Sequence, residues 1–354
     1  MKQIGIYSLV VCVVFLAAGC TELSEDTVKT EVEQQETAET RVETQEAAKT
    51  EVEAEEQGPS IRLVLKFSPA DSTTYRVALE TDKSVQWEGG ASKPKGFQGG
   101  HTGNKMEMTF ARRIQSVDDQ GNATARITIK ALKYLATIKN NVTLDFDSSR
   151  EEDRSNPLNK LIGQSYTIEI TPSGEVSKVA DTSDALAAVK GDSAANNVAV
   201  RLLSADAIKE QHTIRALPAV GKNQLRKGDN WSSMKKVSFD LMGTKSYEKV
   251  YTLKEITNVG NRRIAVAEME AVASAENAKQ LHKEQATGSF SKMFDNTETY
   301  TGELRLNLTE GKVEKCRERL LVEWFIVNPN PKADEPPAAL RMAATRLHSI
   351  ERID

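Results

Sequence analysis

The sequence predicts a mostly β protein of the α+β class, in which two antiparallel β-meander halves are joined by a helical connector and followed by a C-terminal helix. Two observations support this prediction. Apolar and polar residues alternate along many short runs between residues 59 and 328, as in strands that bury one face. Residues 181–218 and the end of the chain instead space their apolar residues at helical intervals. Sheets with one wet face are usually antiparallel.

Residues 1–19 have the layout of a secretory signal peptide. Lys2 gives a positive start, and the apolar run from Ile4 to Ala18 is shorter than the roughly 20 residues that cross a bilayer. The run ends in FLAAGC, which resembles the bacterial lipobox and implies a lipidated Cys20; the alternative is an ordinary signal with an accidental cysteine. Acyl chains on Cys20 would hold the protein at a membrane. By the family rule, Thr21 after that cysteine favours the periplasmic face of the outer membrane.

Residues 20–58 carry the lipidated cysteine and a predicted disordered, acidic tether. A ten-residue repeat reads KTEVEQQETA, ETRVETQEAA and KTEVEAEEQG, and residues 21–58 contain 13 acidic and 3 basic residues. High charge with little to bury favours disorder. A helix is the alternative, but its valines would form no common stripe. The rest of the mature chain is only mildly basic, so we expect no nucleic-acid partner.

The N-terminal β half is predicted at residues 59–180 and the C-terminal β half at residues 219–328. Turn signals such as Thr171–Gly174 and Thr309–Gly311 separate the alternating runs. The halves echo one another: RIQSVDDQGNATARITI resembles EITNVGNRRIAVAEM, and ITPSGEVSKV resembles NLTEGKVEKC. A duplication explains these pairs, and chance resemblance between strands is the alternative.

Two regions are predicted to be helical. The first is the connector, residues 181–218, which Leu217-Pro218 ends. The second follows a Pro-rich link within residues 329–354, where one helical stripe collects Leu340, Ala343, Leu347 and Ile350. We expect this C-terminal helix to dock on the sheet rather than to bind a partner.

Cysteine usage excludes an internal disulfide in the mature chain. Cys12 leaves with the signal and Cys20 is modified, which leaves Cys316 as the remaining thiol. Cys316 lies in a predicted strand, so we expect it to be buried rather than reactive.

Catalytic and metal-binding patterns are sparse, and we predict no catalytic residue, no metal and no cofactor. The four histidines accompany no HExxH, CxxC or GxSxG motif. His348 and Glu351 stand one helical turn apart, but a solvated helix face is favoured over a metal pair. The glycine-rich loop 88–103 is predicted to be a mobile hairpin tip, since it lacks the ending of a phosphate-binding loop. A solvated loop is also favoured over a calcium site for the carboxylates of Asp145, Asp147, Glu151, Glu152 and Asp153.

An ordered series of weak motifs accompanies the lipobox. It comprises Asn156–Leu158, Gly163–Ile168, Pro172–Val176, Leu217-Pro218, Gly228–Trp231 and Thr301–Leu304. Together they resemble a bacterial envelope lipoprotein family built on a domain of unknown function, over nearly all of residues 61–327. The resemblance implies the architecture and leaves the activity open.

The sequence supports two functional hypotheses. The first is a lipid-anchored envelope protein that acts as a non-enzymatic β-scaffold for a protein or an envelope polymer. The alternative is a periplasmic carrier of an apolar, lipid-like ligand, which needs an apolar cavity between sheet and helices. Trp231 is the candidate ligand-binding residue. We favour a packing role for it, because the turn at Gly228-Asp229 would lay the indole over the edge of the sheet.

Overall fold

Strands make up most of the chain that the structure, a computed structural model, describes. The described residues are 60–89, 97–191, 193–219, 221, 223–273, 295–327 and 338–354, all within the unit Ala54–Asp354. The signal peptide, Cys20 and the acidic tether lie outside them. None of the helices in the described part of the chain has the length and apolar character needed to cross a bilayer.

The strands and helices follow one another in a simple order. The strands are β1 (Ile61–Arg62), β2 (Ser72–Glu88), β3 (Gly100–Val117), β4 (Ala123–Ile138), β5 (Asn141–Asp147), β6 (Ser165–Ile170), β7 (Val176–Ala180), β8 (Gln224–Leu225), β9 (Asn230–Ser238), β10 (Thr244–Val259), β11 (Arg262–Ala273), β12 (Asp295–Asn307), β13 (Lys312–Val327) and β14 (Ala339–Arg352). The helices are α1 (Ser183–Ala188), α2 (Ser193–Leu203) and α3 (Ala205–His212), with short 3₁₀ turns η1 (Glu151–Asp153), η2 (Pro157–Leu161) and η3 (Asp240–Met242).

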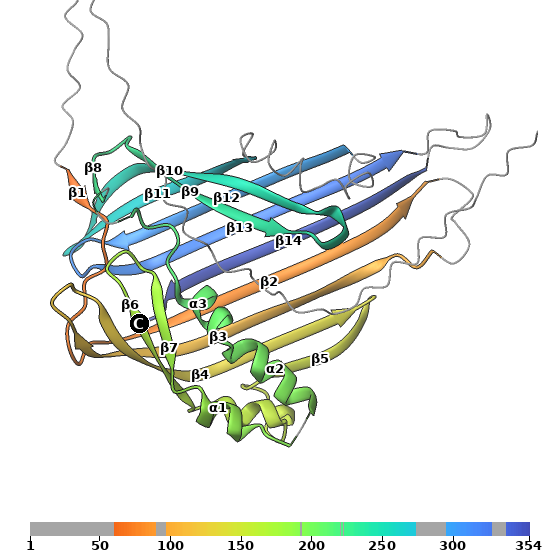
Figure 1. The fold of residues 1–354 in the computed structure, drawn as a ribbon, viewed down its shortest axis with the longest axis horizontal. Coiled ribbons are helices and arrows are strands. Elements are labelled where there is room, and N and C mark those ends of the chain that lie inside the picture. The colour runs from red at the N-terminus through yellow and green to blue at the C-terminus, as the bar shows by residue number, and fades with distance from the viewer. Residues whose placement is uncertain are drawn as a thin grey trace, which may run out of the picture. The chain divides into compact units, whose positions relative to one another are not determined.

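Twelve of the strands form one large sheet in which every pair is antiparallel (Figure 1). Its order is β7-β6-β4-β3-β2-β14-β13-β12-β11-β10-β9, with β5 added to β4, while β1 pairs with β8 separately. The prediction of a mostly β protein with antiparallel pairing is therefore confirmed. Both predicted halves belong to a single sheet.

The predicted C-terminal helix is wrong, because Ala339–Arg352 is the central strand β14. It pairs with β13 on one side and β2 on the other, so that Ile350 lies opposite both Cys316 and Val77. Its leucine, alanine, arginine and methionine residues are good helix formers, but pairing on both sides satisfies the backbone, and tertiary context overrides that propensity. On a strand, His348 and Glu351 point to opposite faces. The solvated helix face predicted for this pair is also wrong.

The echoed segments occupy corresponding hairpins of the sheet. In the N-terminal half they cover the β3–β4 and β6–β7 hairpins, and in the C-terminal half the β10–β11 and β12–β13 hairpins. Both sets of four strands follow chain order across the sheet in the same direction, and β2 and β14 lie between them. Each half is a meander, and β14 joins the two.

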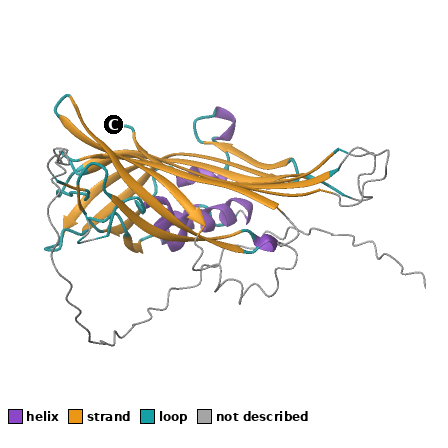
Figure 2. Cartoon of the chain, turned by 90° about the horizontal axis from the view of Figure 1, so that it is seen from above, coloured by secondary structure: helices purple, strands orange, loops and turns teal. Residues whose placement is uncertain are grey.

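Helices α1 to α3 occupy residues 183–212 and lie along one face of the sheet (Figures 1 and 2). The side chain of Ser204 caps α3 by accepting a hydrogen bond from the Ala207 N–H over 3.2 Å. At the other end of α3, His212 is buried against the sheet. It forms a 2.6 Å hydrogen bond with the Tyr166 hydroxyl of β6 and packs edge-on against Phe110 of β3. Side chains of β3 and β6 thus hold the end of α3 against the inner face of the sheet.

The sheet curls so strongly that edge strand β9 returns toward its centre. The Arg346 side chain of β14 donates to the Ser238 carbonyl of β9 over 2.6 Å, and Phe239 packs on Trp324 of β13 with ring centroids 5.1 Å apart. Four strands separate β9 from β14 in the sheet order. A flat sheet would therefore place them about 24 Å apart. This curvature brings inner-face side chains of the C-terminal half into contact across the sheet.

Candidate functional site

Trp231 of β9, the candidate ligand-binding residue, is 9% exposed. Its ring stacks on Tyr251 of β10 with centroids 5.4 Å apart, and its Nε1 donates a hydrogen bond to the Ala216 carbonyl over 3.0 Å. One ring face and the N–H are therefore engaged within the protein. This arrangement suits a packing role, in which Trp231 ties the edge of the sheet to the segment after α3. Cys20, the predicted lipidation site, lies outside the described residues.

A network of charged and polar side chains is buried inside the curled half. The Glu318 carboxylate of β13 accepts hydrogen bonds from Lys249 Nζ over 3.0 Å and from the hydroxyls of Tyr251 over 2.7 Å and Tyr300 over 2.9 Å. Lys249 and Tyr251 come from β10 and Tyr300 comes from β12, so side chains of these two strands converge on one carboxylate of β13. The Lys249–Glu318 pair is almost fully shielded from solvent.

Electrostatics explain why Glu318 stays charged. Burial alone would raise its pKa, but the Lys249 charge and the donated hydrogen bonds hold the pKa down to about 2. Burial beside this carboxylate raises the pKa of Tyr251 and Tyr300 well above the usual range. These phenols therefore remain hydrogen-bond donors. Three donors occupy the carboxylate, which leaves it poorly placed to act on a substrate.

His348 lies beside this network on the inner face of β14, opposite Glu318 in the neighbouring strand. Its Nε2 is buried and has no hydrogen-bond partner among the described residues. Burial lowers its pKa. The pockets described below include neither His348 nor the Glu318 network, so these residues form part of the packed interior.

Cys316 is 1% exposed in β13, which confirms the predicted burial. Burial, and then the charge of Glu318, raises the pKa of its thiol to about 12. A thiol with so little thiolate is a poor nucleophile. Cys316 acts as a small core residue.

The acidic cluster at 145–153 is neutralised by neighbouring cations. Arg150 pairs with Asp145 over 3.0 Å and with Asp153 over 2.6 Å, and Arg154 pairs with Glu151 over 2.7 Å. In the part of the chain that the structure describes, no group of three His, Cys, Asp or Glu residues is arranged to hold a metal ion.

One pocket, of about 350 Å³, lies between β2, β3, β4 and the segment around Arg150. Its cations are Lys105, Lys133 and Arg150. Lys105 pairs with Glu80 over 3.1 Å and Lys133 with Asp147 over 3.2 Å, while Arg150 holds its own carboxylates. With its charges balanced in this way, the pocket has little to attract an anionic ligand.

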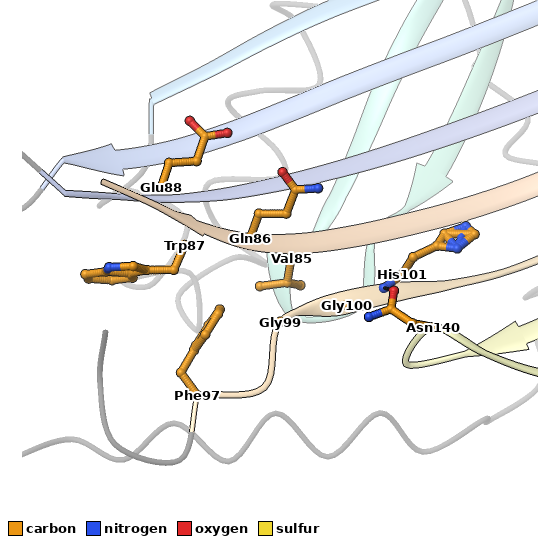
Figure 3. A pocket seen from close by; sticks show the side chains of 9 residues that line it. All are labelled: Val85, Gln86, Trp87, Glu88, Phe97, Gly99, Gly100, His101 and Asn140. Atoms are coloured by element: carbon orange, nitrogen blue, oxygen red, sulfur yellow. Dashed lines mark hydrogen bonds between the residues drawn. The ribbon is translucent and has the colours of Figure 1, made fainter. Parts of the chain in front are cut away.

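A second pocket, of about 370 Å³, lies at the end of the sheet where β2, β3 and the β4–β5 turn meet (Figure 3). We call it the rim pocket. It is lined by Val85, Gln86, Trp87, Glu88, Phe97, Gly99, Gly100, His101 and Asn140. It combines aromatic and polar side chains, and it is the candidate functional site.

Two aromatic rings form one wall of the rim pocket. Trp87 is the penultimate residue of β2 and Phe97 precedes β3, and their ring centroids lie 6.2 Å apart with a tilt of 58°. Figure 3 shows both rings on the same side of β2, with Gln86 and Glu88 on the other side. Trp87 Nε1 is buried without a hydrogen-bond partner among the described residues. Such an unmet donor usually costs about 1–3 kcal/mol.

Glycine keeps the backbone of β3 close to this wall. A Cβ on Gly99 would lie 2.7 Å from the Val85 carbonyl oxygen and 3.1 Å from the Phe97 ring. The sequence therefore needs glycine here for close approach of the chain. The loop 88–103 was predicted to be a hairpin tip, and β2 and β3 do form a hairpin around it; residues 90–96 lie outside the described chain.

The opposite wall comes from the two-residue turn between β4 and β5. Lys139 and Asn140 both have positive φ, 48° and 68°, as a tight hairpin turn of this kind requires. Asn140 Oδ1 accepts a hydrogen bond from the His101 N–H over 2.9 Å, and the Asn140 N–H donates to the His101 carbonyl over 2.9 Å. These bonds fix the side chain, while its Nδ2 has no partner among the described residues.

Charged groups at the rim pocket are paired. The His101 ring is hydrogen-bonded to the Asp82 carboxylate, and Arg341 of β14 pairs with Glu88 over 3.2 Å. Burial raises the pKa of Asp82, an effect that His101 opposes. The pocket therefore presents amide, indole and backbone groups rather than an excess of charge.

Sequence reasoning did not single out Trp87 and Phe97. The available signal was the pair of aromatic residues that flank the glycine-rich loop, in WEGG and GFQGG. Asn140 is far from them in sequence, and only the pairing of β3 with β4 brings its turn alongside.

Comparison with known proteins identifies a family but no activity. The model of a family described as a family of unknown function (DUF6263) matches residues 120–313, more than half of the chain. None of the curated proteins matches it. A solved structure of lipid–protein interactions in lipovitellin is 10% identical with a TM-score of 0.35, over 82% of this chain and 26% of that chain. The structure of DynF from the dynemicin biosynthesis pathway of Micromonospora chersina is 6% identical with a TM-score of 0.17, over 87% and 93% of the two chains. The chain spans about a quarter of the lipovitellin chain, and scores this low support no functional argument.

Proposed function

Because the chain belongs to the DUF6263 family of unknown function, membership assigns it no activity, and we propose one from its sequence and geometry. The protein is a lipid-anchored, non-enzymatic β-scaffold of the bacterial cell envelope. It binds a protein or an envelope polymer from its place at the membrane.

The packed interior is the observation that supports this proposal best. Side chains from α1–α3 and from the sheet belong to one buried apolar cluster, and the buried Glu318 carboxylate is engaged by three donors from the protein itself. A carrier needs an apolar cavity in that position, and an acid–base catalyst needs a group in reach of substrate. The rim pocket lies instead at the end of the sheet, where a scaffold can meet a large partner.

The anchor in this proposal rests on the lipobox-like FLAAGC and on Cys20. Acyl chains on Cys20 attach the protein to the membrane, and Thr21 directs it to the periplasmic face of the outer membrane. In cells grown with a palmitate analogue, the full-length chain is expected to take up label and fractionate with the outer membrane. The Cys20→Ala variant is expected to lose both properties. Equal labelling of the two chains would contradict the anchor.

One observation favours the alternative, a carrier of an apolar ligand. Near the rim pocket, the inner face of the sheet presents Ile326, Leu340 and Met342, which are only partly buried. Met342 lies opposite Val85 and Leu340 opposite Trp87 in the paired strands. An acyl chain lying along this strip would gain hydrophobic contact.

Binding to isolated envelope components tests the scaffold proposal. The full-length chain in detergent is mixed with peptidoglycan sacculi in one experiment and cross-linked within intact envelopes in another. The proposal predicts retention by the sacculi or a saturable cross-link to one envelope protein. Absence of both, together with a lipid bound in one-to-one amount, would replace the scaffold with the carrier.

A further inference from the structure

The rim pocket has the chemistry of a glycan site. Resting on the proposed function, we propose that this pocket binds the sugar chain of an envelope polymer, with a pyranose ring against Trp87 and Phe97. The inference narrows the binding partner to an uncharged glycan segment and places the contact at the end of the sheet.

The aromatic wall matches one side of a sugar. A pyranose ring presents a face of C–H groups, which is apolar, and an edge of hydroxyl groups, which is polar. Trp87 and Phe97 offer two rings, tilted by 58° and 6.2 Å apart between centroids, and together they form one apolar wall against which the C–H face can lie. Aromatic side chains provide large apolar contact at low conformational cost.

The polar groups match the hydroxyl edge. Asn140 Nδ2 has no partner among the described residues, and its side chain is already oriented by the 2.9 Å bond from the His101 N–H. Asn140 is exposed at the turn, so a sugar oxygen would accept a hydrogen bond from its Nδ2 in place of water. A few fixed polar groups beside an apolar wall are typical of small-ligand sites.

Charge and polarity argue against other ligands. Glu88 pairs with Arg341, and His101 is hydrogen-bonded to Asp82, so the described residues that line the rim pocket include no unpaired cation for a phosphate or a nucleic acid. An acyl chain would displace water from the Asn140 amide without replacing its hydrogen bonds. A neutral, hydroxyl-rich ligand satisfies both constraints.

Intrinsic tryptophan fluorescence of the full-length chain in detergent tests the inference. The probes are chitotetraose, which carries acetamido groups, and cellotetraose, which does not. We expect saturable binding of at least one probe, and Trp87→Ala or Phe97→Ala to weaken it by about tenfold. Calorimetry provides the affinities of the variants that lack Trp87. Trp87→Phe keeps a ring but loses the N–H, and is expected to fall between wild type and Trp87→Ala.

Val142→Ala provides the matched control. Val142 is exposed on β5 beside the same turn, and its truncation should change affinity by less than about twofold. Thermal unfolding of each variant confirms that the fold is retained. Absence of binding to both probes, or equal binding by wild type and Trp87→Ala, would overturn the inference.

Sacculi distinguish this inference from the proposed function. Retention of wild type and Trp87→Ala to the same extent would place polymer binding elsewhere and leave the scaffold intact. Cross-linking to an envelope protein without any glycan binding would also refute the glycan site and leave the scaffold proposal intact. If the Cys20→Ala chain binds phosphatidylglycerol vesicles and Trp87→Ala abolishes that binding, the rim pocket is a membrane contact and the glycan site is refuted.

Discussion

Glu318 shows how a charge is kept inside this sheet. Moving a carboxylate out of water costs several kcal/mol, which an ion pair offsets only when hydrogen bonds satisfy the remaining lone pairs. Lys249 provides the charge, and the hydroxyls of Tyr251 and Tyr300 complete the set. Because the donors come from β10 and β12, the pair also fixes how the curled strands register with β13.

Replacing Glu318 with glutamine leaves Lys249 as a buried charge without its counter-ion. Glu318→Gln is expected to lower the free energy of unfolding by about 3–5 kcal/mol. The control is Glu303→Gln: Glu303 pairs with Lys315 at a partly exposed site, and its loss should cost less than about 1 kcal/mol. Urea unfolding of both variants measures the difference. Equal costs would mean that the buried network contributes no more than a surface pair.

The buried histidines predict a loss of stability in mild acid. Burial lowers the pKa of His212 to about 3, and it also lowers that of His348. Unfolded histidine titrates near about 6.5, so the unfolded chain binds more protons than the folded chain below that pH. Their contribution is complete above about pH 6.5 and decreases as the pH falls toward 3. Glu318, with a folded pKa of about 2, loses its contribution only below about pH 4.5.

The window from about pH 6.5 to 5 therefore reports on the histidines. His212→Gln retains a hydrogen-bonding group for Tyr166 and removes the titration. We expect the free energy of unfolding of this variant to depend less on pH across the window than that of the wild type. His212 faces Tyr166 and Phe110, with the charge of Arg112 nearby. An unchanged slope would show that His212 does not couple folding to protonation.

Trp231 belongs to the packing at the edge of the sheet. Truncation of a buried tryptophan costs about 3–5 kcal/mol, and Trp231→Ala also leaves the Ala216 carbonyl without its donor. The melting temperature of this variant should fall sharply. Met234→Ala on the same strand is the control, since Met234 is exposed. A variant that melts like wild type but fails to bind sacculi would make Trp231 a binding residue.

Among the elements, strands were predictable from sequence and β14 was not. Alternation and turn signals reflect local physics, namely one buried face and a sharp reversal, and they locate hairpins such as β3–β4 and β12–β13. β14 contains Leu-Arg-Met-Ala-Ala-Thr-Arg-Leu, in which helix formers dominate. Its strand state depends on β2, more than 250 residues earlier in the chain. No local pattern contains that information.

The same reasoning explains what was missed at the sites. Lys249 and Glu318 stand in alternating strands where a charged residue normally indicates the solvent face. They are buried because the sheet curls and places β10 over β13. Asn140 and Trp87 likewise line one pocket only because strand pairing places the β4–β5 turn beside the β2–β3 hairpin. Sequence could indicate the hairpin tip but not which side chains surround it.

Removal of β14 tests whether one strand joins the two halves. A chain that ends at residue 338 loses the partner of both β13 and β2, so we expect it to lose its cooperative thermal transition and to be digested rapidly by protease. A chain that ends at Arg352 keeps every residue of β14 and should unfold cooperatively. If the shorter chain melted like wild type, the C-terminal segment would be an accessory to two independent halves.

At the scale of the whole described unit, the buried core and the rim pocket are built from different side chains. The curled sheet and α1–α3 bury a continuous core, in which Lys249 pairs with Glu318 and Arg112 donates a hydrogen bond to the Tyr75 hydroxyl. The rim pocket lies where the end of β2, the start of β3 and the β4–β5 turn meet. In the scaffold we propose, the core provides stability and the rim provides recognition, while Cys20 holds the protein at the membrane.

Native mass spectrometry distinguishes this scaffold from a lipid carrier most directly. The Cys20→Ala chain, purified in mild detergent and transferred to a volatile buffer, removes the contribution of the proposed anchor. The account predicts the mass of the polypeptide without a bound lipid, because apolar side chains of the helices and of the sheet are buried together in one cluster. A lipid retained in one-to-one amount, and lost when Met342 is replaced by arginine, would contradict it and establish a carrier.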